Sequence, residues 1–226
     1  MMKRLGTAAR LTAGSALTAW HYMWRTTPWS RCEVPGSPEE DRPPPLPDAV
    51  DAAGLQLPEH GVGPLFHRCY RVRIRDARLS PEEVMARVTA DPNRVAPTEM
   101  ARFELVGDAR EGLAVGDEYV VRIAGPWDGP VRAVAVTPTS FRLATLTGHL
   151  EAGQIEFRVR GDDGLVFEIE SWARSADRVV NFFYEFLPFA KESQLHMWTS
   201  MLEQVVELTG GRRTGRMEIE TRRADG

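Results

Sequence analysis

The stretch from residue 116 to residue 173 most constrains what this chain can fold into. Five segments there alternate apolar and polar, or small and large, side chains with a period of two residues, and each is bounded by Gly, Pro or Asp. This pattern is typical of strands with one buried face, and the short connections between them favour an antiparallel sheet. The predicted strands are residues 116–125, 130–137, 140–147, 153–161 and 165–173.

Other elements are predicted before this run. Residues 66–75 form a strand, and Ser80 caps a helix over residues 81–90 that begins with Pro81. Residues 101–107 are a further strand candidate. The strand at 66–75 places Phe66, Tyr70, Val72 and Ile74 on an apolar face, and His67, Arg71, Arg73 and Arg75 on the other face. The basic row is either a solvated face or an anion-binding strip.

The hairpin at residues 161–164 predicts a specific register. If Asp162, Asp163 and Gly164 form a three-residue loop with Gly164 at positive φ, Arg158 lies opposite Glu168 on the outer face. A slip by one residue would place apolar side chains against charged ones. Phe157 and Val159 would then share the inner face with Phe167 and Ile169.

A long helix is predicted from Asp177 to about Leu208, and Gly210-Gly211 ends it. Pro188 falls within this range, so either the helix kinks there or two helices meet. Lys191 and Gln194 lie on the apolar stripe, either as its polar edge or facing a cavity between helix and sheet. His196 lies nearly opposite the stripe and should face water. The stripe comprises Leu195, Trp198, Met201, Leu202 and Val205.

Proline and charge divide the chain into four parts. Residues 33–62 are acidic and rich in proline, which fixes φ and lacks an N–H donor. We expect them to form an extended linker or a surface loop that wraps the domain, and the prolines of residues 33–54 exclude a helix or a central strand there. This segment separates an N-terminal helical appendage (residues 1–32) from the main domain (residues 63–211). The charged residues 212–226 are predicted to be a flexible tail.

Residues 5–24 have helical character, with apolar side chains along one stripe. Polar residues interrupt the run, and it falls short of the roughly 20 apolar residues that span a bilayer. Three interpretations stay open for this segment. It docks onto the domain or a protein partner, it lies at a membrane surface, or it is a cleaved signal.

Composition and motifs exclude several classes of function. The formal net charge of −4 argues against a nucleic-acid-binding protein. The five histidines lack ligand spacing, and the sequence contains neither a P-loop nor a nucleophile elbow, so we expect no metal and no cofactor. Cys32 and Cys69 are interpreted as reduced thiols of a cytoplasmic protein, with a disulfide between them as the alternative.

The order of strand, short helix, antiparallel strands and long C-terminal helix resembles the helix-grip fold of the START and Bet v 1-like (SRPBCC) superfamily. The segments GDEYVVRIAGPW (116–127) and TLTGHLEAGQIEFRV (145–159) resemble more closely the uncharacterised family named domain of unknown function nineteen-ninety. That family has a Gly-His-x-Glu-x-Gly-x-x-x-Phe stretch, here Gly148, His149, Glu151, Gly153 and Phe157. The resemblance covers residues 64–209. It implies an α+β fold in which a curved antiparallel sheet wraps around a long C-terminal helix.

This resemblance leaves three functions open. Superfamily members bind lipids, sterols and other apolar ligands between helix and sheet, and some are polyketide cyclases or aromatases. We favour a binding module for a small apolar or amphipathic molecule; the alternatives are a cyclase or isomerase, and an interaction protein whose core is filled. In an enzyme, His149, Glu151 and Lys191 would transfer protons. The alternative for His149 is a structural role, in which its ring forms hydrogen bonds with buried backbone groups of a hairpin. The expected ligand-binding residues are Tyr119, Trp127, Phe141, Phe157, Phe167, Gln194 and Trp198.

Overall fold

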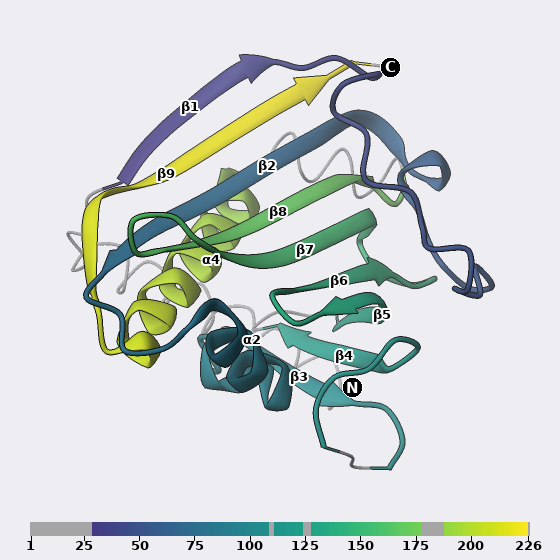
Figure 1. Ribbon diagram of the computed structural model, residues 1–226. Helices are drawn as coiled ribbons and strands as arrows, with labels where there is room; N and C mark the ends of the chain where they lie inside the picture. The colour runs from purple at the N-terminus through teal and green to yellow at the C-terminus, as the bar shows by residue number, and fades with distance from the viewer. Residues whose placement is uncertain (1–28, 109–110, 124–127, 178–187, 226) are drawn as a thin grey trace, which may run out of the picture.

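The computed structural model describes residues 29–108, 111–123, 128–177 and 188–225; the side chains of residues 29 and 188–193 are outside this description. Within these residues, nine strands form one curved sheet in the order β1-β9-β2-β8-β7-β6-β5-β4-β3. Figure 1 shows the helices α2 and α4 on one side of this sheet. The fold is therefore the predicted α+β helix-grip arrangement, in which the sheet curves around the C-terminal helix.

The predicted strands of the central run are all present. They are β4 (Glu118–Ile123), β5 (Asp128–Thr137), β6 (Ser140–Thr145), β7 (Glu151–Gly161) and β8 (Leu165–Ser175). The register of the β7–β8 hairpin is confirmed, because Arg158 pairs with Glu168 and Gly164 has a φ of 120°. The candidate strand at residues 101–107 is β3 (Ala101–Leu105), which pairs with β4.

The first strand of the domain, β2 (Val62–Arg75), lies within the sheet between β8 and β9. Short helices follow it: α2 (Pro81–Ala90) begins with the predicted cap, in which the Ser80 hydroxyl accepts the Glu83 N–H, and η2 (Pro92–Arg94) comes directly after α2. A further turn of 3-10 helix, η1 (Pro58–His60), precedes β2. Val84, Met85 and Val88 of α2 are buried in the core.

The prediction of a flexible tail at residues 212–226 is wrong for most of that segment. Residues Arg212–Ala224 form strand β9, which pairs antiparallel with β2 and parallel with β1. Met217 and Ile219 alternate with Glu218 and Glu220 and are 0% and 3% exposed. The charged side chains stand on the outer face, where Glu218 pairs with Arg71. The alternation was present in the sequence, but the number of charges obscured it.

Residues 29–35 also belong to the sheet, as strand β1 (Trp29–Pro35) at its edge. The predicted boundary between appendage and linker at residue 32 therefore falls inside a strand. Proline at the end of an edge strand removes no ladder hydrogen bond that the sheet needs. The predicted helix at residues 5–24 lies outside the described residues.

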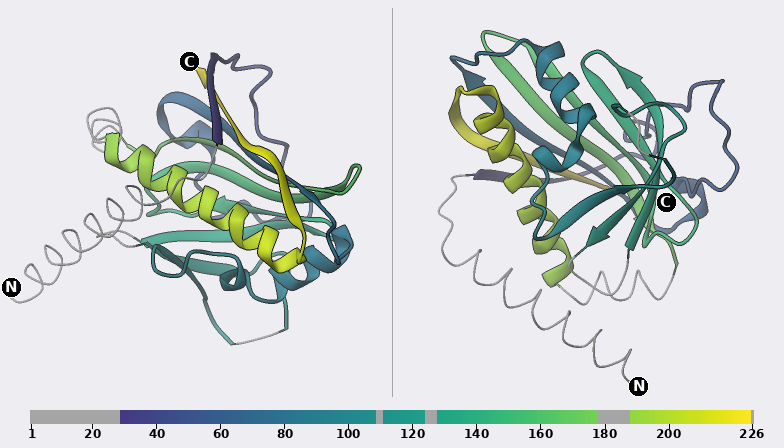
Figure 2. Two further views of the ribbon diagram at one scale, coloured as in Figure 1. Left: turned by 90° about the vertical axis from the view of Figure 1, so that its left-hand side faces the viewer. Right: turned by 90° about the horizontal axis from the view of Figure 1, so that it is seen from below.

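The helix α4 (Pro188–Thr209) packs on the inner face of the sheet, as Figure 2 shows. It ends where predicted, with Gly210 at a φ of 65°. Residues 178–187 lie outside the described residues. The predicted helix start at Asp177, and the kink or junction of two helices at Pro188, therefore stay predictions. The predicted apolar stripe is buried in the core: Leu195, Trp198, Met201, Leu202 and Val205.

The prediction that His196 faces water is wrong, because this residue is only 8% exposed. Thr199 and Ser200 of the same helix are buried as well, at 7% and 3% exposed. The Thr199 hydroxyl donates to the Leu195 carbonyl at 2.9 Å, which satisfies it inside the helix. The helix is thus covered around more of its circumference than one apolar stripe predicts. Periodicity identifies the face toward the sheet but not what covers the other faces.

The Pro-rich residues 36–61, here called the strap, wrap the domain. This is the surface loop that was predicted as the alternative to an extended linker. In Figure 1 the strap descends along the right-hand side of the sheet after β1. Its carbonyls accept hydrogen bonds from sheet arginines: Arg142 donates to Pro44 and Pro45, at 3.1 and 2.9 Å. Arginines can satisfy these carbonyls because prolines leave them without a regular ladder.

Candidate functional site

The space between the sheet and α4 is largely filled by side chains that the sequence predicted as ligand-binding residues. Phe141 and Phe157 stack with ring centroids 4.6 Å apart, and Trp198 of α4 meets Phe157 edge-on at 5.8 Å. Phe167 is 0% exposed, and Tyr119 packs edge-on against Phe103. These aromatics form the core, so any ligand must occupy space beside them.

The loop before β7 has a tight, specific shape. Gly148 has a φ of 98°, which a side chain rarely adopts. Gly153 lies against β8, where an added Cβ would sit 2.1 Å from the Trp172 carbonyl oxygen. The Gln56 amide of the strap donates to the His149 and Glu151 carbonyls, at 2.8 and 2.9 Å. The two glycines of the predicted motif therefore allow a sharp turn and a close strand approach.

His149 is held by its own loop. Its Nδ1 accepts the Glu151 backbone N–H at 2.8 Å, and its ring lies over Gly129 of β5. Burial lowers the pKa of His149, which outweighs the opposing effects of the Glu151 charge and backbone. A neutral ring with Nδ1 engaged as an acceptor matches the hairpin role that was the alternative to acid–base chemistry.

The fold brings Glu151 of β7 and Gln194 of α4 together, a contact that the sequence did not predict. The Gln194 amide nitrogen lies 3.4 Å from each carboxylate oxygen of Glu151. Gln194 thus faces the sheet from α4 rather than standing only at the polar edge of the helix. Of the other predicted residues, Trp127 and the side chain of Lys191 lie outside the described residues. Ligand contact by Trp127 and proton transfer by Lys191 therefore stay predictions.

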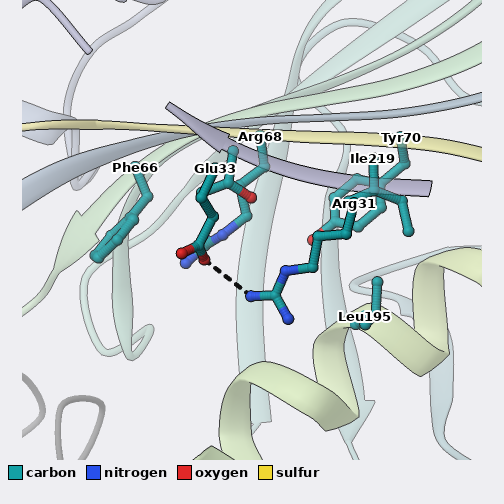
Figure 3. Close-up of a pocket in the computed structure, with 8 residues that line it drawn as sticks. Arg31, Glu33, Phe66, Arg68, Tyr70, Leu195 and Ile219 are labelled. Atoms are coloured by element: carbon teal, nitrogen blue, oxygen red, sulfur yellow. Dashed lines mark hydrogen bonds and ion pairs between the residues drawn. The ribbon is translucent and has the colours of Figure 1, made fainter. Parts of the chain in front are cut away.

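A small hollow remains where α4 passes below β1, β2 and β9, and Figure 3 shows its walls. Its volume is about 20 Å³, and it contains none of the predicted ligand-binding residues. This is room for about one water molecule. The lining residues are Arg31, Glu33, Phe66, Arg68, Tyr70, Leu195, Ile219 and Thr221.

Arg68 is the unusual residue of this hollow. It is 6% exposed, and its Cζ lies 4.6 Å from the centroid of the Phe66 ring. Within the described part of the chain, no carboxylate lies within ion-pair distance of its guanidinium. Glu33 pairs instead with Arg31, at 2.9 Å. Burial raises the pKa of the neighbouring Tyr70 to about 12, so its hydroxyl stays protonated.

The sequence contains a signal that singles out Arg68. Phe66, Tyr70, Val72 and Ile74 were placed on the inner face, and strand alternation puts Arg68 on that same face. A charged residue between inward-facing aromatics is rare in a strand unless it has a partner or a role.

The outer face of the sheet carries a chain of ion pairs. His67 lies between two carboxylates, with Nδ1 2.7 Å from Asp41 of the strap and Nε2 2.8 Å from Glu170. Arg158 continues the chain, 2.6 Å from both Glu170 and Glu168. Burial alone would lower the pKa of His67, but the two carboxylates outweigh it and raise this pKa. The His67 ring also stacks on Trp172, with centroids 5.2 Å apart.

Comparison with protein-family models gives one match, "Domain of unknown function (DUF1990)", over residues 64–203. That range covers more than half of the chain. The chain belongs to the DUF1990 family. In this DUF1990 protein the matched range includes Arg68, His149 and Gln194, whereas β1, β9 and the whole strap lie outside it. Comparison with curated proteins gave no match.

Several solved structures are similar to this DUF1990 protein at low sequence identity. Major latex-like protein 151 of Panax ginseng is 14% identical, with a TM-score of 0.47, over 64% of this chain and 98% of that one. Protein Ms6760 of Mycobacterium smegmatis is 16% identical, with a TM-score of 0.41, over 73% and 97%. The di-domain ARO/CYC StfQ of the steffimycin biosynthetic pathway is 8% identical, with a TM-score of 0.47, over 68% and 52%. Likeness at this level supports no inference about function.

The described residues contain neither a metal site nor a membrane-spanning helix. No group of three or more His, Cys, Asp or Glu side chains there is placed to hold a metal ion. No helix there is long and apolar enough to cross a membrane. Cys32 is exposed, Cys69 is partly buried, and the two thiols are free.

Proposed function

We propose that this protein binds a small amphipathic molecule between the sheet and α4, with Arg68 as the anchor for a negatively charged head group. The observation that carries the proposal is Arg68, a residue only 6% exposed whose guanidinium has no carboxylate partner among the described residues. Burying a charge without a counter-charge is costly. A ligand carboxylate or phosphate would provide that counter-charge and accept paired hydrogen bonds from the guanidinium.

A second buried donor supports this interpretation. The indole Nε1 of Trp198 is buried and has no hydrogen-bond partner in the described structure. Buried Trp N–H groups usually have one. Trp198 does not line the hollow at Arg68, but its Nε1 is an unpaired donor on the helix side of the same apolar core. A ligand with acceptor atoms and an apolar body would suit such walls.

The small volume of the hollow sets a condition for binding. Because about 20 Å³ admits only a water-sized molecule, a ligand must displace a wall. The ion pair of Arg31 and Glu33 forms one wall of the hollow, with side chains 32% and 65% exposed. It stands on β1, which among the described strands pairs with β9 alone. An edge strand held by one ladder can shift at lower cost than a central strand.

Native mass spectrometry of the full-length protein from its own host tests the proposal, comparing the wild type with Arg68→Met. Arg102→Met is the control, since Arg102 is an exposed arginine on β3. We expect a bound small molecule on the wild type and on Arg102→Met, and its loss from Arg68→Met.

Stability measurements separate this role from a structural one. If the charge of Arg68 is paired only when a ligand is bound, Arg68→Met removes an unpaired charge from the ligand-free protein. The unfolding midpoint of that protein should then be unchanged or raised. A structural role would instead lower the midpoint. The proposal is refuted if no variant carries a small molecule, or if Arg68→Met retains the adduct of the wild type.

A further inference from the structure

The opposite face of the sheet has a much larger groove than the helix side. It lies between the strap and strands β2, β7 and β8, and it encloses about 650 Å³. This volume is within the range of small-molecule sites. Its apolar walls are strap prolines and the side chains of Leu46, Leu57 and Leu65. The groove is independent of the helix–sheet site proposed above.

The strap that roofs this groove is fixed at several points. Near its start, Asp41 is bonded to His67. In its middle, Arg142 holds two proline carbonyls. Near its end, Leu55 forms a bridge with Leu146, and the Gln56 N–H donates to the Thr145 carbonyl at 2.7 Å. A roof anchored by buried groups along its length keeps the groove open before a ligand arrives, which lowers the entropic cost of binding.

One buried polar group faces this groove without a partner. Gln154 lines it and is 5% exposed, and its Oε1 is buried with no hydrogen bond in the described structure. Its Nε2 reaches only the Pro44 carbonyl, at 3.5 Å. A buried acceptor without a hydrogen bond lowers the stability of a folded protein by about 1–3 kcal/mol. A ligand that donates a hydrogen bond to Oε1 would recover this cost.

Two arginines give the groove a preference for anions. Arg42 and Arg174 both line it, and neither has a carboxylate within ion-pair distance among the described residues. Arg174 donates one Nη1 bond, to the Gly63 carbonyl at 2.6 Å, which holds the guanidinium in place and leaves other donors available. Glu59 also lines the groove, so the two positive charges face one negative charge.

From these observations we propose that the groove between the strap and the outer face of the sheet is a second binding site. Its ligand is a small organic anion with an apolar, ring-sized body and a hydrogen-bond donor. Arg42 and Arg174 would bind the anionic group, the leucines and prolines would contact the body, and Gln154 Oε1 would accept the hydrogen bond.

The test uses 8-anilinonaphthalene-1-sulfonate, an aromatic anion with an N–H donor, as the probe on the full chain. Fluorescence titration gives its Kd for the wild type, Gln154→Leu, Arg174→Met and the control Arg102→Met. We expect Kd to rise about fivefold in Gln154→Leu and about tenfold or more in Arg174→Met, with no change in the control. Circular dichroism and unfolding midpoints confirm that each variant is folded.

A second readout locates the probe. The side-chain amide signals of Gln154, assigned by their absence from Gln154→Leu, should shift in ¹⁵N-edited spectra as the probe binds. The proposal is overturned if these signals do not move at saturating probe, or if neither groove variant changes Kd by more than about twofold. It is also overturned if Arg68→Met alone abolishes binding, which would place the probe at the helix–sheet site. If Arg68→Met loses the native adduct but still binds the probe, the two sites are separate and both proposals are supported.

Discussion

Replacing Asp41 with Asn tests the ion-pair chain that fastens the strap to the sheet. The Asp41 side chain is 1% exposed; its Oδ2 accepts the Ser37 N–H at 2.7 Å, and its Oδ1 lies 2.7 Å from His67 Nδ1. Hydrogen bonds to charged groups contribute about 1.5–3 kcal/mol each. Asn keeps the shape but loses the charge, so we expect Asp41→Asn to lower the free energy of unfolding by about 2–4 kcal/mol, a large part of a typical total of about 5–15 kcal/mol.

A double-mutant cycle with His67→Phe isolates the pair. Phe retains an aromatic ring to stack on Trp172 and removes both N–H donors. Because Asp41 and His67 are in direct contact, their individual costs should not add, and we expect a coupling energy of about 1–3 kcal/mol near pH 6. Urea unfolding of the four proteins, followed by tryptophan fluorescence, measures it.

The sign of the pH dependence follows from the pKa shifts. The pKa of His67 is raised in the folded state, so its contribution is fully present below the unfolded pKa of about 6.5 and is lost as pH rises through the folded pKa. Burial alone would raise the pKa values of Asp41 and Glu170, but their hydrogen bonds to His67 outweigh burial and lower both values. The stability that these two carboxylates contribute is therefore lost as pH falls through their folded-state pKa values. The coupling should therefore be largest near pH 6 and decline at higher pH. Costs that add within about 0.5 kcal/mol at pH 6, or a coupling that grows above pH 8, would refute this reasoning.

Three further predictions concern packing and exposure. Gly153→Ala should cost about 1–3 kcal/mol or more in urea unfolding, because its Cβ would lie 2.1 Å from the Trp172 carbonyl oxygen; a cost near zero would mean that β7 and β8 are further apart. Cys32 is exposed and should react with a thiol reagent at pH 8 within minutes, whereas Cys69, whose pKa is raised to about 12 mainly by burial, should react only on unfolding; equal labelling rates by mass spectrometry would contradict this. Removing residues 212–226 should lower Tm by more than about 10 °C in circular dichroism, because β1 loses its partner and β2 becomes an edge; a Tm within about 2 °C of the wild type would support a dispensable tail instead.

Local patterns in the sequence were enough to predict most of the central elements. Strand alternation with turn residues gave β4 to β8, and the register of Arg158 opposite Glu168 followed from one loop length. The cap at Ser80 and the stop at Gly210 depend on single residues, so they were predictable as well. Each of these features is decided by neighbours within a few residues along the chain.

The candidate sites depend on contacts between distant segments, and these were predicted less well. Arg68 stood in a strand that was read correctly, but its lack of a partner depends on where Glu33 of β1 points. The groove on the outer face exists only because the strap passes over Gln154 of β7. Neither relation has a signature in residue spacing.

The type of each central element, its apolar face and the antiparallel direction of strand pairing were all predictable from local sequence patterns. The formation of β9 by residues 212–224 and the burial of His196 depend on contacts with distant segments. The physical reason is that alternation and capping are local free-energy preferences, whereas an edge strand or a buried polar residue is stabilised by partners far away in the chain. Only their placement in space shows whether a charged side chain meets water, a carboxylate or an unfilled site.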